Sequence, residues 1–262
     1  AAPADAASAK GSVTVSIACS STGMDQVACR EGAEAWARQS GNRVNIVSTP
    51  VSATARLALY QQFLAARAPD IDVFTIDVVW PGLLGRFLVD LGGYVDAARR
   101  AEYEPALMRN DTVDGRLVAL PWFADAGVLF YRRDLLDKYR LKPPRDWAAL
   151  TEAAATVQRG ERAAGNARFW GFVWQGRAYE GLTCNALEWI ASFDGGGIVE
   201  ASGKVDVDTP RAIAALTMAR GWVGTISPPG VLNYGEEEAR GVWQTGNAVF
   251  MRNWPYAWAL AQ

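Results

Sequence analysis

The strongest constraint on the fold is an alternation of strand-like and helix-like segments over the first 76 residues. Val13, Val15 and Ile17 alternate with polar residues, and this period of two predicts a strand. The predicted order is a strand ending at Cys19, a helix at about 25–39, a strand at 44–47, a helix at about 53–66 and a strand at 71–76. Such βαβαβ units require right-handed crossovers and a parallel sheet flanked by helices. The fold class is therefore predicted to be α/β.

Ligands of open α/β sheets bind outside the carboxyl ends of the strands. Three predicted loops meet at that edge, at 20–25, 48–56 and 77–80, and they carry four candidate binding residues: Asp25, Arg56, Asp77 and Trp80. Arg56 at a helix start opposes the helix dipole, so we expect a ligand or a carboxylate to pair with it. Two alternatives stay open, because Asp77 could only cap a turn and Trp80 could only pack between elements.

A second lobe is predicted to begin after Asp114-Gly115. Its expected elements are helices at about 147–158, 179–193 and 209–221 and strands at 169–174 and 248–251, with a short helix opened by Asn253-Trp254-Pro255. The predicted organisation is a disordered mature N-terminus at 1–11, an N-lobe at 12–117, a C-lobe at 118–246 and a return crossing to the N-lobe at 247–262.

Composition excludes several function classes. The chain has no histidine, which removes Ser-His-Asp and Cys-His catalysis, histidine metal ligation and imidazole switching. Its 26 basic and 28 acidic residues give a net charge of −2, so a nucleic-acid partner is not expected. No apolar run is long enough to span a membrane. The small, polar start AAPADAASAKGS is typical of a secreted, periplasmic protein whose signal peptide has been removed.

The three cysteines bear on the compartment. Cys19 and Cys29 lie ten positions apart, and in an oxidising compartment we expect them to form a disulfide; reduced, buried cysteines are the alternative. Cys184 lies in an apolar helical pattern and is interpreted as a small core residue. No metal-ligand spacing is present, and no metal or cofactor is expected.

Carboxylates and tryptophans together are the residue types that neutral sugars require. Carboxylates accept paired hydroxyl groups, and aromatic rings stack on the C–H face of the sugar. The part of the chain after the predicted first lobe offers a matching set: Trp122, Phe123, Asp125, Tyr179, Glu180, Arg252, Asn253, Trp254 and Tyr256. The position of Trp254 between Asn253 and Pro255 favours a stacking surface. Asp125 could instead be a turn residue, Trp122 a packing residue and Tyr179 a helix-start contact, while Glu236, Glu237 and Glu238 are interpreted as a solvated helix face.

Paired carboxylates beside aromatics also describe glycoside hydrolases, which are the alternative function. The candidate aspartates Asp25, Asp77 and Asp125 have Arg neighbours or polar turns that would keep them ionised, and no apolar pocket is evident that would raise a pKa for a general acid. Binding without turnover is therefore the simpler interpretation, and we expect a protein that is not an enzyme. A protein-interaction scaffold would show no response to sugar at all.

Four separate blocks also resemble a known family. The block VDGRLVALPWFADAGVLFYRRDLLDKYRLKPPRDWAALTEAA resembles the hinge, ligand turn and following helices of family 1 solute-binding proteins of sugar ABC transporters. The trehalose/maltose-binding branch of this family is resembled by the blocks LALYQQFLAARAPDIDVFTIDVVWPGLL, WGFVWQGRAYEGLTCNALEWIASFDGGGIVE and NAVFMRNWPYAWAL. The resemblance implies a type II-like, two-lobed periplasmic-binding-protein fold. It also implies a monomeric receptor that closes on trehalose, maltose or a related α-glucoside and delivers it to the membrane subunits of an ABC permease.

Carried over residue by residue, the resemblance implies sugar contacts at Asp25, Arg56, Asp77, Asp125, Tyr179, Glu180, Arg252 and Trp254. At the position of Asp25 the family more usually has Glu, one methylene longer. Family members also continue for well over a hundred residues more, so the C-terminal part of the fold is expected to be missing from this chain.

Overall fold

The computed structural model describes residues 12–19, 23–200 and 202–260, and the chain forms two compact units, residues 1–124 and 125–262. The disordered N-terminus expected at 1–11 lies outside the described residues. Among the described residues, no helix combines the length and the apolar character needed to cross a membrane. The two units are described separately.

The first unit is built on a parallel sheet of three strands. Its leading elements are β1 (Thr14–Cys19), α1 (Gly23–Ser40), β2 (Arg43–Ser48), α2 (Ala53–Ala66) and β3 (Val73–Phe74). The strand order is β2-β1-β3, and both pairings are parallel, which confirms the predicted α/β class. Strand β3 is shorter than the predicted 71–76, because only Val73 and Phe74 pair with β1.

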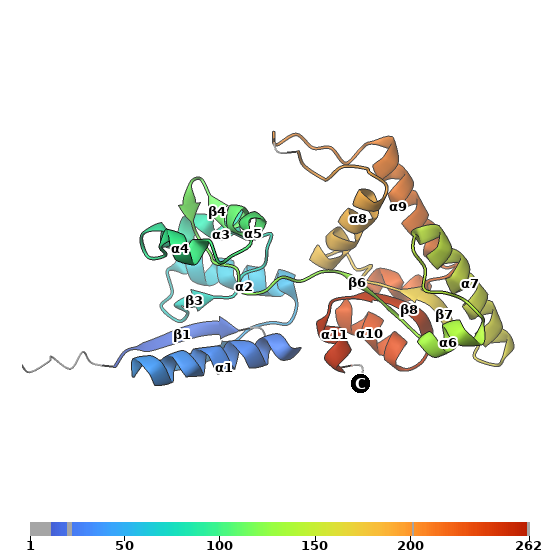
Figure 1. The fold of residues 1–262 in the computed structure, drawn as a ribbon, viewed down its shortest axis with the longest axis horizontal. Helices are drawn as coiled ribbons and strands as arrows, with labels where there is room; N and C mark the ends of the chain where they lie inside the picture. Colours follow the sequence, from blue (N-terminus) through green and yellow to red (C-terminus); the bar gives the residue numbers. More distant parts are fainter. Residues whose placement is uncertain (1–11, 20–22, 201, 261–262) are drawn as a thin grey trace, which may run out of the picture. The chain divides into compact units, whose positions relative to one another are not determined.

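Strand β1 explains how helices cover both faces of this sheet. Ala18 and Cys19 are both buried, and successive strand residues point to opposite faces. Cys19 forms a disulfide with Cys29 of α1, which confirms that prediction. Ala18 lies in a core cluster with Tyr60 of α2. Helices α1 and α2 therefore lie on opposite sides of the strands (Figure 1).

The rest of the first unit is a run of short elements: α3 (Pro81–Leu84), η1 (Gly85–Phe87), η2 (Leu91–Gly93), α4 (Ala97–Arg100), α5 (Pro105–Asn110), β4 (Thr112–Val113) and β5 (Arg116–Leu117). Strands β4 and β5 form an antiparallel hairpin. Its turn is Asp114-Gly115, with φ of 49° and 76°, the left-handed pair that a tight two-residue hairpin loop requires.

The second unit has a mixed sheet in the order β6-β8-β7. Strand β8 (Ala248–Asn253) is antiparallel to β6 (Val128–Tyr131) and parallel to β7 (Trp170–Val173). All six residues of β8 are buried, as expected for a strand covered on both faces. We expected a return crossing at 247–262; here β8 is the middle strand of the second unit, and the crossing itself remains a prediction.

The helical elements of the second unit are α6 (Arg133–Lys138), α7 (Trp147–Ala163), α8 (Glu180–Ser192), α9 (Pro210–Trp222), η3 (Pro229–Asn233), α10 (Glu236–Gln244) and α11 (Tyr256–Leu260). The core contains three tryptophans packed edge to face, with ring centroids 5.1 Å apart for Trp174–Trp189 and 5.7 Å for Trp189–Trp222. The Trp174 Nε1–H donates to Ser227 over 3.0 Å and the Trp222 Nε1–H to Thr151 over 2.8 Å. Much of the tryptophan content is therefore structural.

Candidate functional site

The first unit presents its predicted residues at one edge of the parallel sheet. Asp25 lies in the first turn of α1, directly after β1. Arg56 lies in the first turn of α2, after β2, and Asp77 follows β3. These positions are the carboxyl ends of the three strands, as the βαβαβ order predicted.

Asp25 and Arg56 are close enough to interact electrostatically. Burial raises the pKa of Asp25, and the positive charge of Arg56 opposes that rise. We expected Arg neighbours or polar turns to keep this aspartate ionised, and no environment that would raise its pKa. The second part of that expectation is wrong, because burial raises the pKa by more than Arg56 lowers it. Arg56 thus has the carboxylate neighbour that its place at a helix start required.

Trp80 is almost fully buried, at 2% exposure. Its ring packs edge-on against Tyr60, with centroids 5.9 Å apart, and Tyr60 packs edge-on against Phe74 at 4.9 Å. The Arg56 guanidinium lies over the Trp80 ring, 5.6 Å from its centroid. Trp80 therefore supports Arg56 from the core, and its direct contact with a sugar remains a prediction.

Asp77 does cap a turn, as the alternative interpretation stated. Its Oδ1 accepts a hydrogen bond from the Val79 N–H over 3.2 Å, and its carbonyl accepts from the Trp80 N–H over 3.0 Å. Asn110 at the end of α5 donates to the Val78 carbonyl over 2.8 Å and ties the turn to the rest of the unit. Asp77 is only half-buried, and no donor among the described residues binds its Oδ2, so the capping role leaves one carboxylate oxygen for a ligand.

The segment that joins the two units carries three of the predicted residues. Trp122 and Phe123 are exposed, at 55% and 51%, and they end the first unit. Asp125 begins the second unit; it is exposed, and its Oδ1 accepts the Ala126 N–H over 3.0 Å.

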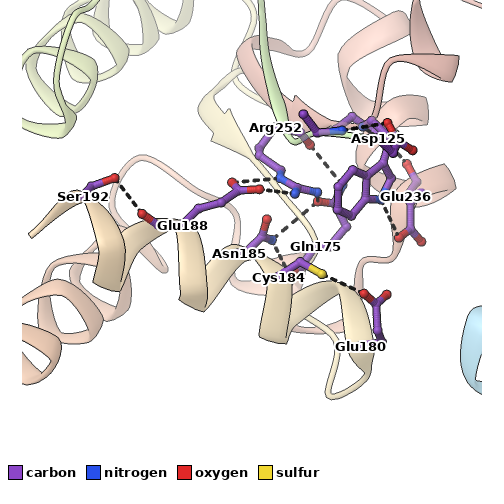
Figure 2. Close-up of polar contacts among 12 residues, drawn as sticks. Asp125, Gln175, Glu180, Cys184, Asn185, Glu188, Ser192, Glu236 and Arg252 are labelled. Atoms are coloured by element: carbon purple, nitrogen blue, oxygen red, sulfur yellow. Dashed lines mark hydrogen bonds and ion pairs between the residues drawn. The ribbon is translucent and has the colours of Figure 1, made fainter. Parts of the chain in front are cut away.

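Arg252 near the end of β8 is buried, at 3% exposure, within a polar network. Its Nε donates to Glu188 of α8 over 3.2 Å, its Nη2 donates to the same carboxylate, and its Nη1 donates to Gln175 over 3.2 Å (Figure 2). Asn185 of α8 donates to the Gln175 carbonyl over 2.9 Å. A Cβ built at Gly127 would clash with Glu188 and Arg252, so the network needs glycine there.

Trp254 is half-buried and held by two charged residues. The Arg252 guanidinium lies 3.8 Å from its ring centroid, and its Nε1–H donates to Glu236 over 3.2 Å. Asn253, which is fully buried, accepts the Trp254 N–H over 2.8 Å and donates to the Glu236 carbonyl over 3.1 Å. Trp254 thus has the partly exposed ring that a stacking surface needs.

Several residues of this network were missed by sequence reasoning. Glu236 was interpreted as part of a solvated helix face, but it accepts the Trp254 indole N–H. Glu237 and Glu238 also accept hydrogen bonds, from the Tyr256 hydroxyl over 2.6 Å and from the Gly235 N–H over 2.8 Å. The three glutamates open α10 directly after its N-cap Gly235, and only that helix boundary could have indicated these contacts. Gln175, Asn185 and Glu188 gave no sequence signal at all.

Tyr179 and Glu180 stand at the start of α8. Tyr179 is the N-cap, and burial first, then the nearby Glu236 and Glu180 carboxylates, raise the pKa of its hydroxyl. The Cys184 Sγ lies 2.7 Å from the Glu180 Oε1 and donates to it (Figure 2). Cys184 is half-buried, not the core residue that we expected. Among the described residues, no group of three cysteine or carboxylate side chains could hold a metal ion.

Comparison with known proteins defines the class. Residues 24–262 match the family described as bacterial extracellular solute-binding protein. The chain belongs to this family of binding proteins, and the two-unit α/β fold agrees with it. The hydrolase alternative receives no support from these comparisons.

Two relatives are particularly informative. The chain is 54% identical over 258 residues to a Deinococcus radiodurans protein named "Probable ABC transporter-binding protein", covering 98% of this chain and 61% of that one. The solved structure of maltose-bound T. maritima MalE3 is 41% identical, with a TM-score of 0.85, covering 95% of this chain and 63% of that one. The GacH receptor of Streptomyces glaucescens, 20% identical with a TM-score of 0.79, shows the fold alone. The chain thus spans less than two thirds of the length of these relatives.

Proposed function

We propose that this chain is part of the substrate-binding receptor of a sugar ABC importer. The receptor binds an α-glucoside disaccharide, maltose or trehalose, and delivers it to the permease subunits in the membrane. It acts in the periplasm as a monomer and does not cleave its ligand. Family membership supports the receptor class, and the similarity to maltose-bound MalE3 supports an α-glucoside as the ligand.

The half-buried Trp254 is the observation that carries the sugar assignment. Its indole is held by Arg252 and Glu236 and keeps part of its surface exposed. The C–H face of a glucose ring is a flat apolar surface that can stack on an indole, and a partly exposed ring that is already held in place loses less side-chain entropy when it does so. Tyr179 and Glu180 at the start of α8 supply hydroxyl and carboxylate groups in the same unit.

The first unit supplies the hydrogen-bonding groups for the same sugar. Asp77 has a carboxylate oxygen beyond the one that caps its turn, and the Asp25–Arg56 pair offers acceptor and donor groups at the strand ends. Hydrogen bonds from sugar hydroxyls to ionised carboxylates are stronger than those to neutral acceptors. We therefore assign Asp25, Arg56 and Asp77 to the sugar hydroxyls and Trp254 to the apolar face.

A titration with matched disaccharides tests this function. Maltose, trehalose and cellobiose are added to the full-length protein while tryptophan fluorescence is recorded. Maltose and cellobiose are both glucose dimers joined through the same positions and differ in the anomeric configuration of the link. Saturable changes with maltose or trehalose, and none with cellobiose, are expected. Equal binding of cellobiose would contradict the α-glucoside assignment, and no response to any sugar would contradict the receptor.

A further inference from the structure

We propose that Arg252, Glu188 and Glu236 are positioning residues, which hold the Trp254 indole in place for the sugar and do not contact the sugar themselves. The inference rests on the proposed function, in which Trp254 stacks on the ligand. It assigns to Arg252 a role different from the direct contact that family resemblance implies.

Three hydrogen bonds hold the buried Arg252 guanidinium to other side chains of the second unit. Its Nε and Nη2 bond to the Glu188 carboxylate, and its Nη1 bonds to Gln175 over 3.2 Å. The side chain is 3% exposed, and its guanidinium lies 3.8 Å from the centroid of the Trp254 ring. A guanidinium that is paired with a carboxylate and stacked on an indole at once is fixed in orientation. Arg252 therefore serves as a rigid support under one face of the ring.

The groups behind Arg252 are part of the core of the second unit. The Gln175 Nε2 donates back to the Arg252 carbonyl over 3.0 Å, and Asn185 holds the Gln175 carbonyl over 2.9 Å. Glu188 and Asn185 belong to α8, and Figure 2 shows both on the side of that helix facing Arg252. Arg252 is buried, at 3% exposure, so breaking its ion pair with Glu188 would leave a buried charge without its partner, which is strongly destabilising. The ion pair therefore keeps the guanidinium in place over the Trp254 ring.

Glu236 fixes the other degree of freedom of the ring. It accepts the indole N–H over 3.2 Å, so the ring cannot rotate in its own plane without losing that bond. The Asn253 side-chain amide donates to the backbone carbonyl of Glu236 over 3.1 Å and so fixes the backbone at Glu236. One face and one edge of the indole are thus occupied by the protein, and the remaining exposed surface is presented to the ligand. A ring fixed before binding loses less side-chain entropy when the sugar arrives.

A double-mutant cycle tests this positioning role. If Glu236 acts only through Trp254, the losses of maltose affinity caused by the two substitutions will not add. Maltose affinity is measured for the full-length protein and for Trp254→Ala, Glu236→Leu and the double variant. Trp254→Ala is expected to weaken binding by roughly tenfold or more, and Glu236→Leu by roughly three- to tenfold. In the Trp254→Ala background, Glu236→Leu should have no further effect. Additive losses would overturn the proposal, because Glu236 would then act on the sugar directly or on the whole fold.

Two further variants sharpen the cycle. Glu236→Gln keeps an acceptor oxygen for the indole N–H and should bind maltose like the parent. Arg252→Lys keeps the charge beside Glu188 but loses the planar group over the ring, and its loss of affinity should also vanish in the Trp254→Ala background. If Arg252→Lys does not fold, Glu188→Gln, which keeps an acceptor for Arg252, replaces it. Additivity in either cycle would overturn the proposal.

A readout without sugar separates this inference from the proposed function. The indole N–H resonance of Trp254 is identified in a ¹⁵N-labelled sample by its absence from Trp254→Phe. It should move in Glu236→Leu and Arg252→Lys and stay in place in Glu161→Gln, which alters an ion pair with Lys138 elsewhere in the same unit. An unmoved resonance would overturn the positioning role even if sugar binds. If the resonance moves in these variants but the parent protein binds no sugar, the positioning of Trp254 by Glu236 and Arg252 would be supported and the receptor function would be overturned.

Discussion

Asp25, a candidate sugar contact, is a residue whose burial lowers stability at neutral pH. Burial raises the pKa of its carboxyl above the usual 3.8, although Arg56 lies close by. The folded protein therefore holds this proton more tightly than the unfolded chain does. Between pH 3.8 and the higher pKa of the folded state, the free energy of unfolding falls as pH rises. Above that range, the free energy of unfolding is lowered by the full penalty of burying the ionised carboxylate.

Asp25→Asn should therefore stabilise the protein at neutral pH while weakening sugar binding. Asparagine removes the charge that burial penalises, but it also removes the ionised acceptor for sugar hydroxyls. Urea unfolding at about pH 7 and about pH 4 should show a stabilising difference that shrinks at the lower pH. The control is Glu161→Gln, because Lys138 lowers the pKa of Glu161 and this variant should lose stability at neutral pH. A destabilised Asp25→Asn at neutral pH would contradict the account.

Asp77 and Asp125 should each contribute directly to affinity. Replacing either by alanine is expected to weaken sugar binding by about 1.5–3 kcal/mol, the scale for hydrogen bonds to a charged group. Because Asp77 also caps a turn through Val79, Asp77→Asn is the control that keeps that bond. Calorimetric titration separates the roles. If only the alanine variant of Asp77 loses affinity, the residue shapes the turn and does not touch the sugar.

At the scale of elements, the disulfide joins Cys19 at the end of β1 to Cys29 of α1, the helix that carries Asp25 in its first turn. Cys19 and Cys29 are ten residues apart, and closing a loop of that size stabilises a fold by roughly 3 kcal/mol. Replacing both cysteines by serine should lower the free energy of unfolding of the parent by about that amount in oxidising buffer. Reduced parent protein should behave like the variant. An unchanged unfolding midpoint would show that the bond contributes nothing to this unit.

The sequence predicted elements better than side-chain networks. Period-two alternation and helix signals located β1, α1, β2 and α2, because each element buries a face whose spacing is visible in the sequence. Strand β3 is shorter than predicted, because an apolar run does not reveal how many of its residues find a partner strand.

The candidate site was predicted unevenly for a similar reason. Residues that follow strand ends, such as Asp77, could be named from topology alone. Glu188 and Glu236 could not, because their role depends on which residue of another element lies opposite them. Arg252 was named as a sugar contact, yet its burial against Glu188 is a property of the packed second unit and is invisible in the sequence.

At the scale of the whole molecule, we expect one sugar to bind residues of both units. A ligand that binds only the folded state stabilises what it touches, by about 2.7 kcal/mol at a hundred times its dissociation constant. Saturating maltose should therefore slow amide hydrogen exchange in both units. Exchange is measured in residues 12–19 and 23–124 of the first unit and in residues 125–200 and 202–260 of the second. Protection confined to one unit would restrict the sugar site to that unit.

The most direct test of the central claim is calorimetric titration of maltose and trehalose into the full-length protein, with glucose assayed in the same samples. Saturable heat is expected for at least one of the two sugars, with one sugar bound per protein and no glucose released. The raised pKa of Asp25 makes the glucose assay necessary, because a general acid in a hydrolase needs the same property. Absence of binding heat, or release of many glucose molecules per protein, would contradict the claim that the chain is a sugar receptor.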